Sequence, residues 1–96
     1  MTHTPDRWCL VDTPVATKVF ASWTGSYLGS PSWRLSSGNE SVEVTKDSYL
    51  IKGLSGSVYE CRKNAYGLTG YGASVLNHSK LEPMSEEDAI KSIKEL

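Results

Sequence analysis

With 96 residues, the chain is long enough for one domain with a modest core and too short for separate substrate and cofactor domains. A hydrophobic content of 39% and a charged content of 22% are typical of a folded globular domain, and the net charge of −1 gives no general reason to expect nucleic acid or an anionic membrane. Because the N-terminus lacks a basic and apolar signal pattern and no apolar run approaches about 18 residues, we expect a cytoplasmic protein without a membrane span.

The first third of the chain predicts two strands. Residues 1–6 are expected to form a flexible N-terminus, and residues 7–12 and 15–23 alternate or favour extended structure. In the second strand Phe20 stands on the face opposite the other apolar residues, so another element or an interface is expected to cover it. The tryptophans fall on inward faces of predicted strands and are candidates for the core: Trp8, Trp23 and Trp33.

The middle of the chain predicts an antiparallel meander of about four strands after a glycine- and serine-rich loop at residues 25–31. Gly38-Asn39 has the composition of a two-residue hairpin turn, and the segment from Gly53 to Gly56 has that of a longer hairpin link. The predicted strands are residues 32–36, 40–46, 48–52 and 57–63.

The last third predicts an aromatic and glycine-rich loop at residues 64–72, followed by a short helix or a final strand at 73–81, of which we favour the helix. A clearer helix is predicted for 85–96, because Ser85 and Asp88 have the spacing of a capping box. This helix carries one apolar stripe, which must pack on the sheet or on another subunit: Ala89, Ile90, Ile93 and Leu96.

Together these elements predict a single α+β domain, mainly β over residues 7–72. We expect five or six antiparallel strands in a strongly bent sheet or small barrel, with a C-terminal helix over one face or end. The exposed position of Phe20 and the apolar stripe of the last helix further suggest a homodimer.

The leading functional hypothesis is a non-enzymatic module that binds a small organic ligand or a partner protein, without a cofactor or a metal. Aromatic walls with a few hydroxyl groups suit such ligands, and loops rich in glycine and serine hold several aromatic residues. The predicted ligand-binding residues are Trp23, Tyr27, Tyr66 and Tyr71.

The sequence also contains residues for three other kinds of site. Cys61 could act as a nucleophile with His78 as its base, although a buried cysteine on an inward strand face is the simpler interpretation. A zinc site would have to combine both cysteines with histidines and lacks any closely spaced ligand pair. Basic residues beside tyrosines could also bind single-stranded nucleic acid, namely Lys52, Arg62 and Lys63 with Tyr59, Tyr66 and Tyr71.

The segments Gly53 to Cys61 (GLSGSVYEC) and Ser32 to Gly38 (SWRLSSG) resemble parts of small uncharacterised proteins carried by bacterial mobile gene cassettes and prophages. The resemblance covers about the central half of the chain. It implies a compact, oligomeric, accessory bacterial protein, and it transfers no catalytic residue.

Overall fold

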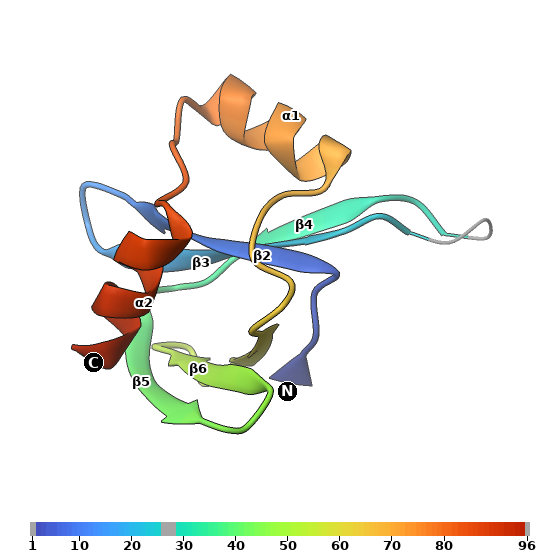
Figure 1. The fold of residues 1–96 in the computed structure, drawn as a ribbon. Coiled ribbons are helices and arrows are strands. Elements are labelled where there is room, and N and C mark those ends of the chain that lie inside the picture. Colours follow the sequence, from blue (N-terminus) through green and yellow to red (C-terminus); the bar gives the residue numbers. More distant parts are fainter. Residues whose placement is uncertain (1, 26–28, 96) are drawn as a thin grey trace.

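The computed structural model describes residues 2–25 and 29–95, and their fold is α+β, as predicted, with a C-terminal helix (Figure 1). Seven strands and two helices lie within these residues: β1 (Thr2–His3), β2 (Arg7–Asp12), β3 (Thr17–Trp23), β4 (Ser32–Leu35), β5 (Asn39–Val44), β6 (Ser48–Gly53), β7 (Val58–Arg62), α1 (Gly70–Ser79) and α2 (Glu86–Lys94). Neither helix has the length and apolar content that crossing a membrane requires.

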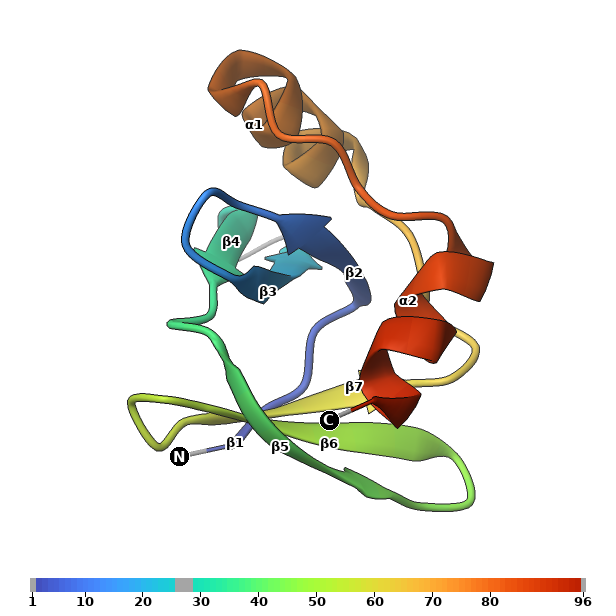
Figure 2. The same ribbon diagram turned by 90° about the vertical axis from the view of Figure 1, so that its left-hand side faces the viewer.

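The strands form two sheets, so the prediction of one bent sheet or closed barrel is wrong. One sheet has the order β1-β7-β6-β5, with β1 parallel to β7, and the other has the order β2-β3-β4. Figure 2 shows α1, the three-stranded sheet and the four-stranded sheet as successive layers, with α2 along one side. All six strands that the sequence predicts are present in some form, and β1 is the addition.

The chain changes sheets between β4 and β5, which is why no barrel closes. Gly38-Asn39 does not make the predicted hairpin, because β4 pairs with β3 and β5 pairs with β6. Gly38 has a φ of +130°, which favours glycine, and its carbonyl accepts a hydrogen bond from the Leu54 N–H at 3.1 Å. The turn residue therefore serves a crossover that is tied to the β6–β7 link.

Strand β2 is buried on both faces, and this pattern explains the layers. Trp8 and Leu10 face the core between the two sheets, whereas Cys9 and Val11 face a second cluster under α1. A strand that buries both faces needs a covering layer on each side. Phe20 belongs to the second cluster and is only 1% exposed.

Helix α1 confirms the preference for a helix after the aromatic loop, but it begins at Gly70, within the predicted loop. Thr69 provides the N-cap, because its side chain accepts a hydrogen bond from the Gly72 N–H at 2.9 Å. The helix ends at Ser79, and Lys80 follows in the left-handed conformation at φ 57°. Its position over β3 supplies the cover that Phe20 was expected to need.

Helix α2 begins as predicted, with the Asp88 N–H donating to the Ser85 hydroxyl at 3.2 Å. Ala89 and Ile93 are fully buried in the core between the sheets. Phe20 and the part of this helix face formed by Ala89 and Ile93, two features that suggested a homodimer, therefore pack within one chain. Leu96 of the predicted stripe lies outside the described residues.

The sequence predicts a flexible N-terminus over residues 1–6, but the structure ties residues 2–5 to the rest of the fold, and Met1 lies outside the described residues. Thr2 and His3 form β1, which pairs with the edge of β7, and Pro5 is fully buried. The Trp23 indole N–H donates to the Thr4 carbonyl at 2.9 Å. A sheet edge and an indole donor both bind this segment, and neither could be recognised from the segment's own sequence.

Candidate functional site

Tyr66, one of the predicted ligand-binding aromatics, holds parts of the fold together. The Tyr66 hydroxyl donates to the Met84 carbonyl at 2.7 Å and accepts from the Leu10 N–H at 3.2 Å. Its ring meets Trp8 edge-on, with centroids 4.8 Å apart. Burial raises the pKa of Tyr66 to about 12, so the phenol stays neutral and keeps both hydrogen bonds.

The predicted aromatics do not form one pocket. Trp23 is half-buried against the core between the sheets, and its indole is bonded to the N-terminal segment. Tyr71 is 41% exposed and lies in the first turn of α1, on the other side of the three-stranded sheet. Tyr27 lies outside the described residues. The convergence of loops that the hypothesis required is not seen among Trp23, Tyr66 and Tyr71.

A different aromatic surface forms where β4 meets α1. Trp33 stacks on buried Phe20, with ring centroids 5.6 Å apart and an interplanar angle of 17°, yet it is 44% exposed. The sequence correctly places Trp33 on an apolar face but wrongly predicts that it is buried. We call the exposed indole of Trp33 and the Phe20 ring beneath it the Trp33 surface.

Helix α1 approaches this surface very closely at Gly72. A Cβ atom at Gly72 would lie 3.0 Å from both Cβ and Oγ of Ser22 and 3.2 Å from Cε1 of Phe20. Ser22 is the cross-strand partner of Trp33. The first turn of α1 therefore packs on Ser22 and Phe20, and Trp33 is the cross-strand neighbour of the first and the stacking partner of the second.

Within residues 2–25 and 29–95, the backbone of β4 also offers hydrogen-bonding groups without a backbone partner. The Ser36 N–H donates to the Val19 carbonyl at 2.9 Å, and antiparallel ladders alternate from such a pair. By this alternation Arg34 bonds to β3, whereas the N–H and C=O groups of Trp33 and Leu35 point away from it. Because β4 is the last strand of its sheet, these groups lie on an open edge.

The other strands at sheet edges are less able to accept an additional strand. The outer side of β2 is bonded to residues 65–67 and 84. Strand β5 carries Glu40 and Glu43 and has a register irregularity near its start, and both features oppose the addition of a strand. Strand β1 has only two residues. Of the edges described, β4 is the one best able to accept another strand.

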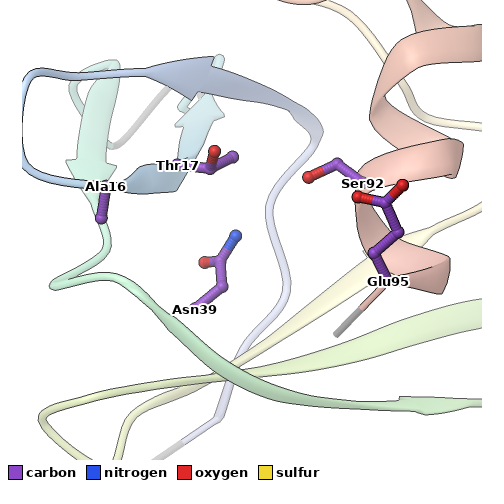
Figure 3. A pocket seen from close by; sticks show the side chains of 5 residues that line it. All are labelled: Ala16, Thr17, Asn39, Ser92 and Glu95. Atoms are coloured by element: carbon purple, nitrogen blue, oxygen red, sulfur yellow. The ribbon is translucent and has the colours of Figure 1, made fainter.

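A hollow of about 310 Å³ lies between the starts of β3 and β5 and the end of α2 (Figure 3). Its lining offers hydroxyls, an amide and one carboxylate, but no cysteine or histidine that could serve as a nucleophile or base. The Thr17 hydroxyl already donates to Asp12 at 2.7 Å. None of the predicted aromatics lines it, and the lining residues are Ala16, Thr17, Asn39, Ser92 and Glu95.

The cysteine and histidine candidates are kept apart. Cys9 and Cys61 are free thiols without solvent exposure, and burial raises the pKa of both thiols, that of Cys9 to about 12. Cys61 lies between the sheets, whereas His78 is exposed in the last turn of α1, beyond the other sheet. Among the described residues no three histidine, cysteine or acidic side chains gather as metal ligands.

The basic residues proposed for nucleic acid are also divided. Arg62 pairs with Ser48 at one end of the β6–β7 hairpin, whereas Lys52 pairs with Val58 at the other. Tyr59, which was expected beside them, is only 3% exposed. The predicted combination of these cations with that aromatic is therefore not assembled.

Comparisons with the models of known protein families, with curated proteins and with solved structures gave no match to this chain.

Proposed function

We propose that the protein is a non-enzymatic binding module that takes up an extended segment of a partner protein as an additional strand along β4. The observation that carries this proposal is the coincidence of two features at Trp33. Its backbone lies on an open sheet edge. Its indole is exposed to solvent on one side and stacks on the buried Phe20 ring on the other. Strand addition uses both, since edge hydrogen bonds provide affinity and side-chain contacts provide specificity.

The arrangement favours a partner protein over a small organic ligand. Trp23 and Tyr66 are engaged by backbone groups, and the hollow of Figure 3 is mainly polar. A flat indole beside open backbone groups suits an extended chain whose alternate apolar side chains reach the Trp33 surface. Each backbone hydrogen bond would contribute only about 0.5–1.5 kcal/mol net. Useful affinity therefore also requires an apolar side chain of the partner to pack on the Trp33 indole.

A second copy of this chain fits the edge less well. The antiparallel register that pairs the outward groups of Trp33 with those of Leu35 would place two Arg34 side chains opposite each other, and directly opposed like charges destabilise a sheet. The proposal therefore does not need the predicted homodimer. Native mass spectrometry would show whether the protein forms one. An accessory bacterial role, as the sequence resemblance implies, and the predicted cytoplasmic location are part of the proposal.

The experiment begins with a displayed library of extended peptides in which apolar residues alternate with random ones. Binding of selected peptides is then measured by fluorescence anisotropy with the wild type, Trp33→Ser and Val44→Ser. Val44 is the matched control because it is an apolar residue, 58% exposed, on β5, the edge strand of the other sheet that opposes strand addition. Trp33→Ser should weaken binding about thirtyfold, the effect of losing a central anchor worth about 2 kcal/mol, and Val44→Ser less than about twofold.

Two results would contradict the proposal. One is a selection that yields no binder, and the other is a set of binders that tolerate Trp33→Ser as well as Val44→Ser. Far-ultraviolet circular dichroism of both variants shows whether the fold is retained, so that lost binding is not confused with unfolding.

A further inference from the structure

A second surface, which extends from the edge strand β2 opposite β4 to the end of β7, concentrates positive charge on a chain whose net charge is −1. It lies at the end of β7 and the adjoining β5–β6 turn, beside the start of β2. Two hollows of about 320 and 280 Å³ adjoin each other there and share Arg62 and Asn64. We call this surface the cationic corner, defined by Arg7, Lys46, Arg62, Lys63 and Asn64.

Arg62 is held in place without losing its charge. Its Nη2 group donates to the Pro5 carbonyl at 3.1 Å and to the Asp6 carbonyl at 3.4 Å. The Arg62 carbonyl in turn accepts the Trp8 indole N–H at 2.7 Å. Carbonyl oxygens orient a guanidinium but carry no net charge to neutralise it, so the remaining N–H groups keep their full attraction for an anion.

The neighbouring side chains add to this attraction, and two carboxylates oppose it. The Lys63 ammonium lies over the Tyr49 ring, 5.2 Å from its centroid. Asp6 lines the first hollow and Asp47 the second. The Asp6 carboxylate accepts from both the N–H and the hydroxyl of Thr24, at 2.9 and 3.0 Å. These hydrogen bonds stabilise it without removing its charge.

We propose that the cationic corner binds a ligand with two linked phosphate groups, one in each hollow, with Arg62 between them. A single small anion would gain little, because two carboxylates offset part of the attraction of the four cations. Two phosphates that bridge Arg62 engage all four cations together, and the guanidinium and the Asn64 amide supply directional donors. The diphosphate of a small molecule and adjacent phosphates of single-stranded nucleic acid share this chemistry.

The probe is inorganic pyrophosphate, titrated into the full chain at about 20 mM salt and followed by amide chemical shifts, with orthophosphate as the reference ligand. Pyrophosphate should bind at least about tenfold more tightly than orthophosphate, and the affinity should fall as salt is raised towards 200 mM. The largest shifts should fall on residues 62–64. A preference below about twofold, or shifts confined elsewhere, would overturn the proposal.

The double variant Lys46→Gln/Lys63→Gln tests the site while leaving the hydrogen bonds of Arg62 in place. It should weaken pyrophosphate binding at least about tenfold, and the control Lys52→Gln less than about twofold. Lys52 is a suitable control because it is an exposed lysine at the other end of the same hairpin. Equal affinities for the double variant and the wild type would refute the site. Arg62→Gln is a further variant, whose folding is checked by thermal unfolding.

A short single-stranded oligonucleotide distinguishes the two sources of phosphate. If the oligonucleotide binds, pyrophosphate displaces it and the double variant loses it, the site takes a nucleic-acid backbone. If pyrophosphate binds and the oligonucleotide does not, the site takes a small diphosphate. Oligonucleotide binding that resists both pyrophosphate and the double variant would contradict a role for this corner.

Discussion

Two glycines in the first turn of α1 provide a sharp test of how this helix packs. Gly70 and Gly72 lie two positions apart, but a Cβ atom at Gly70 would have no atom within 4 Å, apart from its chain neighbours and the helix's own backbone. A Cβ at Gly72 would meet Ser22 at 3.0 Å and Phe20 at 3.2 Å. We therefore expect Gly70→Ala and Gly72→Ala to change stability in opposite directions.

The expected magnitudes follow from two competing terms. Replacing glycine by alanine in a helix gains about 0.5–1 kcal/mol, because the unfolded chain loses conformational freedom. At Gly70 this gain should be kept in part or in full. At Gly72 the added methyl group must displace Ser22 or Phe20, and overpacking of this kind costs about 1–3 kcal/mol. Phe20 has little room to move, since it is buried and stacked on Trp33.

The assay is urea unfolding of the wild type and the two variants, followed by circular dichroism. The free energy of unfolding should be higher for Gly70→Ala than for Gly72→Ala by about 1–3 kcal/mol, with similar slopes against urea. Equal stabilities, or a more stable Gly72→Ala protein, would refute the close packing of α1 on β3. That result would also remove the support for the packing of α1 beside the Trp33 surface.

Three further predictions concern the core and the titrating groups. Ile93→Ala should lower the free energy of unfolding by about 2–5 kcal/mol, because Ile93 is fully buried. Ile90→Ala, at a half-buried position of the same helix, should lower it less. Equal urea midpoints for the two variants would argue against the docking of α2. Burial and the nearby positive charge of Arg34 lower the pKa of His3 below 6.5, so stability should decrease as the pH falls through about 6.5, where the unfolded chain gains protons first. His3→Phe should remove that part of the pH dependence, and unchanged pH profiles would contradict it. Cys61 should resist a thiol reagent until urea unfolds the chain, and rapid labelling of the native protein would contradict its burial.

Features with local signals could be predicted from the sequence. The β6–β7 hairpin follows from strands on either side of a glycine link, and the structure confirms it with the Gly53 N–H donating to the Ser57 carbonyl at 2.8 Å. The start of α2 follows from the spacing of Ser85 and Asp88. In each case residues close in the chain determine the structure, so no knowledge of distant partners was required.

Features that depend on distant partners could not be predicted. Gly38-Asn39 has the composition of a hairpin turn, but only the pairing of β5 with β6 shows that the chain changes sheets there. The two glycines of the first turn argue against a helix, yet Gly72 is where α1 needs the closest approach to β3. Strand pairing and helix docking both override such local preferences.

The candidate site depended on long-range structure to the same extent. Tyr66 reaches backbone groups of Leu10 and Met84, which no motif near Tyr66 announces. For Trp33, alternation identifies its face but not its exposure. Its exposure depends on β4 being the last strand of its sheet and on how far α1 extends over it.

The most direct measurement of the central claim is amide hydrogen exchange along β4, by nuclear magnetic resonance, with and without a selected peptide. In the free protein the Trp33 and Leu35 amides should exchange quickly, and the Arg34 amide, which bonds to β3, should exchange slowly. Peptide binding should slow Trp33 and Leu35 and leave Arg34 slow. If a bound peptide leaves Trp33 and Leu35 unprotected, the peptide does not add a strand to β4 and the proposed function is wrong.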